Sequence, residues 1–382
     1  MGAVIAAFVP AVRAEPLRLR ADAIAQTQAP AGLLVLSGED RARPWVEVEA
    51  LVWAAGRPEV GGDVLVLSVR LHDPQGRGEL RVGRMVVTTG AIRPLQIDGA
   101  SGLVRAPWGT SLESFAGAPV VPRFGERFME FAGGGRVAQA MGSSAVAGLS
   151  YVQVRGHGEI DREELGGDLA LMPVKWLDLA ARGAYDLQSS GIAEVLGSAA
   201  IRAGAWRLEG FGSQRSPSRL LPATSLFSVL GDLPSRSVGT TLRWQAAPRL
   251  DLLGSAAVQS SEGSLGGNGW VRGRLWLDDR GDSSVGVELR RQSVGTARWT
   301  GARTVLSLAL AGGFRCTNEL ELAVPDEERN GVFVWPWALV ALSWRSRRGW
   351  EIAGAVEASS TPQNRYETTA LARLSHPWEV SP

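Results

Sequence analysis

The chain has 382 residues and one cysteine, Cys316, which excludes an intramolecular disulfide and any zinc, haem or iron–sulfur site held by a cysteine pair. Forty basic and thirty-nine acidic residues give a net charge of +1, so the composition offers neither a cationic surface for nucleic acid nor the charge excess of a disordered chain. Glycine (47 residues) and tryptophan (14 residues) are abundant, and the mean hydropathy is 0.00. This mixture predicts a folded protein and is unusual for a soluble enzyme.

The N-terminal region carries a short apolar run at residues 3–12 that stops at Val12-Arg13-Ala14. Small residues at the −3 and −1 positions before Glu15 are typical of a secretory signal peptide, although the basic segment that usually precedes the apolar run is missing. We therefore expect residues 1–14 to be a signal peptide that is truncated at its start. The alternative is an ordinary buried N-terminus.

No later segment has the pattern of a membrane helix. Such a helix needs about 18 or more consecutive apolar residues. The longest apolar run, at residues 332–342, is shorter than this and contains Pro336. Helical membrane spans are therefore not expected.

The rest of the chain alternates apolar side chains with charged or small ones, over about ten residues at a time, which is the period of a β-strand. In residues 177–186 the odd positions are apolar or small, and the even positions include Asp178, Arg182 and Asp186. The same alternation recurs at residues 238–244, 270–277, 283–290, 315–324 and 350–357. Each of these runs predicts a strand with one apolar face and one polar face.

Short groups of turn residues separate the runs at even spacing. They lie at residues 73–76, 246–248, 278–282, 311–313 and 346–349. Their Gly, Pro and Asp content is typical of hairpin turns. Between residues 45 and 374 we count about 20 candidate strands, and Pro94, Pro107 and Pro119 make about two of them doubtful. The sequence therefore predicts about 18 antiparallel strands, within a range of about 16–20.

Three architectures could hold so many strands: a soluble sandwich or propeller, a solenoid, or a membrane barrel. No blade or solenoid repeat is visible. A membrane barrel needs an outward apolar band, a polar lumen, short turns and aromatic girdles at its two rims. The tryptophans near the ends of runs fit such girdles, unless they are ordinary strand residues. These are Trp53, Trp206, Trp244, Trp270, Trp276, Trp344 and Trp350.

This combination of features resembles a Gram-negative outer-membrane β-barrel of the porin-like kind. The resemblance implies an all-β fold, a single large antiparallel transmembrane β-barrel at residues 44–374, in the outer membrane. Residues 15–43 would then form a periplasmic or lumen segment, and residues 375–382 a C-terminal tail. One feature departs from the pattern of such barrels, which usually end on an aromatic residue: this sequence closes with Trp378-Glu379-Val380-Ser381-Pro382, so that Trp378 or a different final strand would have to substitute.

The sequence contains no pattern that indicates catalysis. Nucleophile elbows, phosphate-binding loops, dinucleotide fingerprints and metalloprotease motifs are missing. The three histidines, His72, His157 and His376, lie far apart in sequence and without metal-ligand spacing. We therefore expect no enzyme activity, no cofactor and no metal site.

The polar faces of the predicted strands carry charges of both signs. In a wide pore these charges would face the lumen and let ions of either sign pass. The alternative is that they only keep one face of a sheet soluble. The candidate lumen residues are Asp178, Arg182, Asp186, Arg243, Arg272, Arg274, Glu288, Arg290, Glu319 and Glu321.

The longest stretch without alternation lies at residues 213–235, and its centre is too apolar for a solvated loop. We expect this stretch to fold into the lumen as a constriction or to dock a partner, unless it is merely an extended hairpin. The residues concerned are Leu220, Leu221, Leu226, Phe227 and Leu230. The proline-containing residues 94–122 form a second irregular region of the same kind.

The predicted function is an outer-membrane pore for passive or partner-assisted passage of a solute through a mixed-charge lumen. Its predicted partners are the lipid bilayer and, in the assisted case, a periplasmic protein, without nucleic acid; the oligomeric state stays open. The first alternative is a barrel scaffold that sheathes a partner, such as a multihaem cytochrome of an electron conduit or part of a polysaccharide export complex. The second is a soluble secreted all-β binding protein, which would need a true apolar core.

Overall fold

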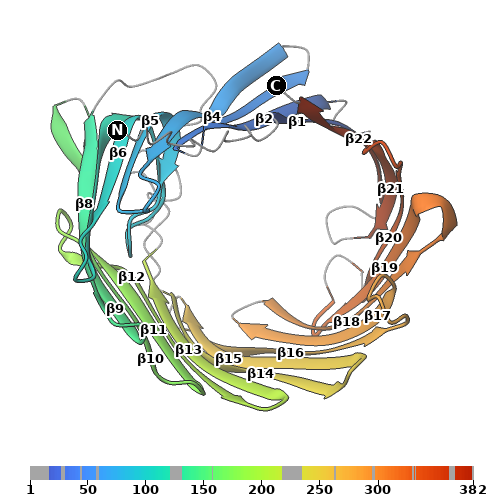
Figure 1. Cartoon of the computed structure of the whole chain (residues 1–382). Helices are drawn as coiled ribbons and strands as arrows, with labels where there is room; N and C mark the ends of the chain where they lie inside the picture. The colour runs from blue at the N-terminus through green and yellow to red at the C-terminus, as the bar shows by residue number, and fades with distance from the viewer. Residues whose placement is uncertain are drawn as a thin grey trace, which may run out of the picture.

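A computed structural model describes residues 17–26, 31–43, 45–56, 60–120, 131–156, 158–216, 235–261, 264–294, 297–328, 331, 333–360 and 366–380. These residues form a single closed antiparallel β-barrel of 22 strands (Figure 1). Each strand pairs with its neighbours in sequence. The last strand, β22, pairs with the first, β1, and this pairing closes the sheet into a ring. This closure satisfies the backbone hydrogen bonds that an open sheet would leave exposed to lipid.

The strands run in chain order around the ring. Their bounds are β1 Leu17–Gln26, β2 Ala31–Arg43, β3 Val46–Gly56, β4 Val60–His72, β5 Gly78–Val87, β6 Leu95–Arg105, β7 Thr110–Pro119, β8 Phe131–Met141, β9 Ala145–Gly156, β10 Glu159–Val174, β11 Leu177–Asp186, β12 Gly191–Ala203, β13 Trp206–Arg215, β14 Ser235–Ala247, β15 Leu250–Ser261, β16 Ser264–Trp276, β17 Ser284–Val294, β18 Ala297–Ala309, β19 Phe314–Pro325, β20 Trp335–Arg345, β21 Glu351–Ser359 and β22 Glu367–Val380. A single 3₁₀ turn, η1 at Ala311–Gly313, joins β18 to β19.

The all-β barrel predicted from the alternation is confirmed, but the strand count of about 18 and the boundaries are wrong. Residues 15–43 do not form a separate segment, because they include β1 and β2 of the barrel wall. Residues 375–382 are not wholly a tail, because β22 continues to Val380 and pairs with β1. The prolines at 94, 107 and 119 do not reduce the count either: they lie at strand ends or in connections, where a missing N–H costs no ladder bond.

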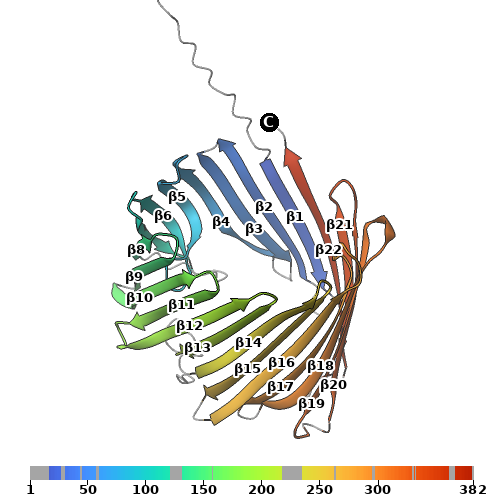
Figure 2. The same ribbon diagram turned by 60° about the horizontal axis from the view of Figure 1, so that its bottom comes forward.

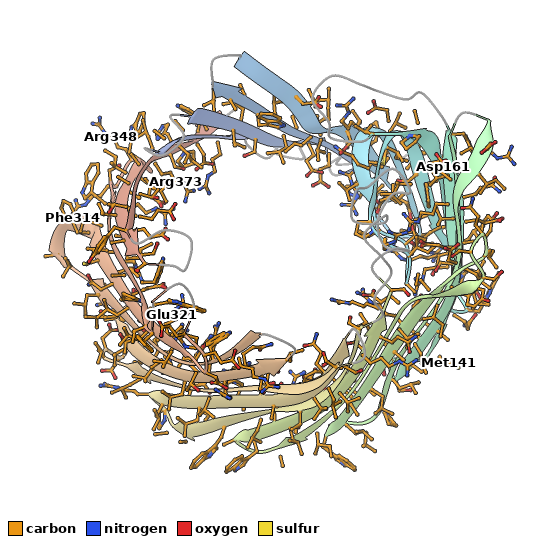
Figure 3. The ribbon with its side chains drawn as sticks, turned by 180° about the vertical axis from the view of Figure 1, so that it is seen from behind. Met141, Asp161, Phe314, Glu321, Arg348 and Arg373 are labelled. Atoms are coloured by element: carbon orange, nitrogen blue, oxygen red, sulfur yellow. The ribbon has the colours of Figure 1, made fainter. Side chains whose placement is uncertain are left out.

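Alternation along each strand divides the side chains between two faces. On β17, Val287 and Leu289 are 48% and 58% exposed, whereas Glu288 between them is 4% exposed. Figure 3 shows Phe314 and Met141 pointing away from the ring, and Glu321 and Arg373 pointing into it. Residues that are paired across two neighbouring strands lie on the same face of the sheet. The pairing register therefore extends the assignment of inner and outer positions from strand to strand. The barrel is therefore apolar outside and polar inside, which is the arrangement of a membrane-spanning barrel.

The two ends of the barrel differ in their connections. The start of β1 and the end of β22 lie at one end, where the chain turns from each even-numbered strand to the next odd-numbered one (Figure 2). These turns are short, as at Lys175–Trp176 between β10 and β11. The opposite end carries several longer connections, such as residues 88–94, although the β16–β17 connection at the first end, residues 277–283, is equally long. No helix among the described residues is long and apolar enough to cross a membrane.

The tryptophans fall into two groups. The first group lies at the end of the barrel that carries the termini, in turns or on the outer face; its members are Trp45, Trp108, Trp176, Trp206, Trp244, Trp344, Trp350 and Trp378. Trp206 and Trp244 stack with ring centroids 4.5 Å apart, and His376 stacks on Trp350 and meets Trp378 edge-on. This group has the composition and place of an interfacial girdle. The second group lies on the inner face: Trp53, Trp270, Trp276, Trp299, Trp335 and Trp337. The prediction of girdle positions for Trp53, Trp270 and Trp276 is therefore wrong.

Candidate functional site in the barrel lumen

The inner face carries arginines and carboxylates that meet across neighbouring strands. Arg272 on β16 lies opposite Glu288 on β17, and its Nε donates to Glu288 Oε2 over 2.6 Å. Arg290, two residues further along β17, donates to the other oxygen of the same carboxylate. Two arginines therefore enclose Glu288 and account for its low exposure. Charge-assisted contacts of this kind are stronger than neutral hydrogen bonds.

The same pairing continues around the ring. Arg303 on β18 binds Glu319 and lies 4.0 Å from Glu321, both on β19. Further cross-strand pairs on β11–β15 and between β22 and β1 are Arg202–Asp178 (2.6 Å), Arg215–Glu194 (2.6 Å), Arg182–Glu194 (3.4 Å), Arg243–Asp251 (2.8 Å) and Arg373–Asp22 (2.8 Å). Together with the Glu288 cluster, these pairs form what we call the charge belt. Because each arginine has a carboxylate partner, the belt presents both signs to the lumen with little net charge.

All ten candidate lumen residues lie at inner-face positions of the register. Most belong to the charge belt, but two have other contacts. The Arg274 guanidinium lies over the Trp276 ring, 5.2 Å from its centroid. Asp186 accepts hydrogen bonds from the backbone N–H groups of Gln188 and Ser189, and so it closes the β11–β12 turn. The expected constriction or docking residues Leu220, Leu221, Leu226, Phe227 and Leu230 lie outside the described residues.

Another segment does fold into the lumen. Pairing between β4 and β5 stops at Leu67–Arg84, although β5 and β6 remain paired as far as Val87–Leu95. The end of this hairpin, residues 84–98, therefore separates from β4, while β6 stays paired with β7 as far as Ile97–Pro119. We call residues 84–98 the inner hairpin. Figure 1 shows it on the inner side of β8. At the point of departure Gly83 has φ +125°, and a Cβ there would come within 2.2 Å of the Leu67 carbonyl oxygen, so only glycine fits.

The inner hairpin packs through an apolar cluster that is unusual for a polar lumen. Met85 and Ile97, directly opposite each other on β5 and β6, are both fully buried. They pack with Ile92 of the connecting loop and with residues of the wall, namely Phe115, Ala132 and Val152. Complete burial of such side chains contributes about 1.5–3 kcal/mol each. The cluster therefore fixes the hairpin against β7, β8 and β9.

Polar contacts attach the tip of the inner hairpin to strand β10 of the wall. Arg93 binds Glu164 on β10, which is 1% exposed. Arg162 donates to both oxygens of Glu164, each over 2.7 Å. Burial and the neighbouring Arg162 lower the pKa of Arg93, but an arginine remains charged in this environment. Breaking this buried cluster would leave an uncompensated charge, which makes the attachment costly to release.

The loop also approaches a second ion pair very closely. Arg136 on β8 binds Asp168 on β10, with Nε–Oδ1 at 3.0 Å and Nη2–Oδ2 at 2.5 Å. Gly90 of the loop has φ +57°, and a Cβ there would lie 2.5 Å from Asp168 Oδ1. The backbone of the loop therefore lies directly on the inner face of β8–β10.

The departure of the hairpin leaves one edge of β4 without its strand partner, and side chains replace the missing ladder. Arg84 donates to the Val64 carbonyl (2.8 Å) and to Asp63 (2.9 Å), and Gln96 donates to the Leu65 carbonyl (2.5 Å). The Arg84 guanidinium also makes a bidentate contact with Asp98, with both bonds at 2.7 Å. Two backbone carbonyls of β4 are thereby satisfied without a β-strand.

From the sequence we placed the inward segment at residues 213–235 and a second region of the same kind at residues 94–122. Most of the second region forms β6 and β7, and it overlaps the inner hairpin only at residues 94–98. One signal was present: at Met85-Val86-Val87 the alternation fails, and apolar residues occupy both parities. A strand covered on both faces has this pattern. The residues of the attachment, Arg93, Arg162 and Glu164, lie too far apart in sequence for their contact to be recognised from spacing.

No protein-family model matches the sequence, and no curated protein matches it. Solved structures do resemble the fold. The translocation pore of the P pilus usher PapC aligns with a TM-score of 0.53 and 9% identity, over 96% of this chain and 100% of that one. PapC in the E. coli P pilus tip assembly intermediate PapC-PapD-PapK-PapG aligns with a TM-score of 0.53 and 11% identity, over 100% of this chain and 63% of that one.

OccK2 (OpdF) of Pseudomonas aeruginosa aligns at a lower TM-score of 0.45 and 11% identity, over 97% of this chain and 99% of that one. At such low identities the similarity to the usher pore concerns the fold alone. That fold is a single large closed antiparallel β-barrel, which is the fold that the resemblance in the sequence predicted.

Proposed function

We propose that this chain is an outer-membrane pore through which small hydrophilic solutes pass passively. The observation that carries this proposal is the charge belt, which lines the inner face of a closed, lipid-facing barrel with paired charges of both signs. A hydrated lumen favours such a lining, because water solvates the exposed parts of each pair. A barrel built only for mechanical support in the membrane would not need it.

The width of the barrel supports the same proposal. Twenty-two strands spaced about 4.8 Å apart and tilted about 40° give a backbone diameter of about 45 Å. Barrels of 16–18 strands already contain an aqueous channel. The inner hairpin covers part of this lumen on the β7–β10 side, and we assign it the role of a fixed constriction.

The second candidate function is a sheath around a partner protein, and the strand number favours it. Barrels of 22 strands commonly hold a plug in the lumen. Within the described residues the strands and their connections leave no domain that could serve as one. A periplasmic partner could therefore occupy the space, and the chain would then act as a scaffold.

Liposome swelling separates the two candidates. The purified chain in liposomes should admit neutral solutes of graded size, such as arabinose, sucrose and raffinose, at rates that fall with solute mass. Swelling no faster than in protein-free liposomes, from barrels shown to be folded by their heat-modifiable migration in gels, would reject the pore. Co-purification of a stoichiometric periplasmic protein with that closed barrel would then support the sheath.

A further inference from the structure

A junction in the barrel wall is closed by side chains instead of a backbone ladder. The pairing of β4 with β5 ends at Leu67–Arg84, so among the described residues no strand pairs with residues 60–66 on the β5 side. In place of a strand, Arg84 and Gln96 donate to two carbonyls of β4. We call this junction, between residues 60–66 and the inner hairpin, the seam. It lies in the half of the barrel away from the start of β1.

Three paired glycines produce the bend that separates the inner hairpin from β4. Gly83 on β5 pairs with Gly99 on β6, which in turn pairs with Gly117 on β7. A Cβ at Gly99 would lie 2.2 Å from the Ala116 carbonyl oxygen, and a Cβ at Gly117 would lie 2.5 Å from that of Asp98. Neighbouring backbones therefore approach too closely for any other residue, and the glycine row allows the sheet to fold inward here.

Beyond this glycine row, the outer positions of the hairpin change from apolar to polar. Leu80 and Val82 on β5 are exposed on the outer face, whereas Arg84, at the next outer position, is 8% exposed and bound to Asp98. If the hairpin straightened and rejoined β4, Arg84 and Asp98 would face lipid, which is costly. The sequence therefore disfavours a wall in which the hairpin closes the seam by strand pairing.

An apolar patch lies on the inner face beside the seam. Val35 on β2 pairs with Trp53 on β3, and Leu51, two residues before Trp53, pairs with Val66 at the edge of β4. Their inner placement follows from the charge belt, because Val35 pairs with Asp22. All four side chains are half-buried, and we call them the inner patch. Contact with an apolar molecule would remove their remaining surface from water, which is favourable.

The lipid-facing surface reaches the seam from the other side. Leu67 and Val69 on β4 are exposed on the outer face, and Leu67 is the sequence neighbour of Val66 in the inner patch. The two apolar surfaces therefore adjoin at the seam. A side-chain hydrogen bond opens by rotation about side-chain torsions, whereas a backbone ladder opens only when two strands separate.

From this arrangement we infer that the seam is a lateral port, through which an acyl chain of a bilayer phospholipid enters the barrel and lies on the inner patch. The inference goes beyond the proposed passage of hydrophilic solutes and does not depend on it. The occupant is a lipid chain, because the seam adjoins the lipid-facing surface and leads to an apolar one. Arg84 keeps its bidentate contact with Asp98 when it releases the Val64 carbonyl, so opening leaves no unpaired charge.

Photolabelling tests this inference. A phosphatidylcholine with a diazirine at the end of one acyl chain is mixed into vesicles that contain the folded chain, and the vesicles are irradiated. Mass spectrometry then identifies the labelled residues. We expect label at Leu51, Trp53 and Val66 in addition to outer positions such as Leu67. Inner positions of β16–β19 should carry only the background seen without irradiation.

Three variants make the test specific. Leu51→Asn should lower the label on the inner patch about tenfold, because a polar side chain weakens the apolar contact. Leu339→Asn is the matched control, since Leu339 pairs with Glu319 on the inner face of a distant part of the wall and should leave this label unchanged. Gln96→Ala removes a hydrogen bond that closes the seam and should raise the label several-fold.

Label on the inner patch no higher than on the inner face of β16–β19 overturns the port. So does an equal effect of Leu51→Asn and Leu339→Asn, or an unchanged label in Gln96→Ala. Only barrels with heat-modifiable migration in gels are counted, so a folding defect does not imitate these results. Liposome swelling tests the pore separately: swelling without inner label rejects the port alone, and inner label without swelling rejects the pore alone.

Discussion

At the scale of single residues, the face of the strand on which a side chain lies decides whether a charge is tolerated there. Val287 and Glu288 are neighbours on β17, yet one faces lipid and the other is enclosed by two arginines. An arginine on the lipid face must be dehydrated or must distort the bilayer, whereas a lumen side chain stays in contact with water. The energetic consequences of substitution should therefore differ by position and not only by residue type.

We expect Val287→Arg to destabilise the barrel by about 2–4 kcal/mol, because this position faces lipid. Glu288→Ala should cost about 1–3 kcal/mol, since it leaves Arg272 and Arg290 without their shared acceptor. Glu321→Ala should cost about 0.5 kcal/mol or less, because its contact with Arg303 is long and half-exposed. Urea unfolding in lipid vesicles measures all three; a cost for Glu321→Ala equal to that for Val287→Arg would contradict the assignment of faces.

At the scale of elements, the inner hairpin shows where sequence patterns stop being informative. The six runs named from alternation all fall on strands of the barrel, namely β11, β14, β16, β17, β19 and β21, because one face of each contacts lipid and the other water. The alternation missed β1 and β2, since the N-terminal residues were attributed to a separate segment. It also missed the separation of residues 84–98 from β4, which brings Arg93 into contact with Glu164, 71 positions away in sequence. The charge belt was recognised only in part, because partners such as Arg202 and Arg303 become evident only from the register.

The bend at the base of the hairpin gives a prediction at this scale. Gly83→Val should destabilise the folded barrel by about 2 kcal/mol or more, because its φ of +125° and the Leu67 carbonyl exclude a side chain. Gly102→Ala, in the wall portion of the same hairpin, has no atom within 3.9 Å of its added Cβ and should be tolerated. The folded fraction at increasing temperature, read from heat-modifiable gel migration, measures the difference. Equal behaviour of the two variants would mean that the bend at Gly83 is not required.

At the scale of the whole molecule, the two groups of tryptophans lie in two different environments. The girdle contacts the lipid interface at one rim, and the inner group contacts the lumen. Lipids brominated near the headgroup should quench only part of the tryptophan emission of the barrel in vesicles. Aqueous iodide should quench a second, separate part, and the two effects should add. If brominated lipid alone quenched the whole emission, the inner-face placement of Trp270 and its neighbours would be wrong.

At the same scale, we propose that the barrel encloses an open aqueous path lined by balanced charge. Planar-bilayer recording of the purified chain tests it most directly, through the conductance and the reversal potential in a potassium chloride gradient. We predict stable ohmic steps with a reversal potential near zero, and larger, noisier steps for Glu164→Ala, which releases the tip of the inner hairpin. Folded barrels that give no steps, or steps with strong selectivity for one ion, would contradict the account.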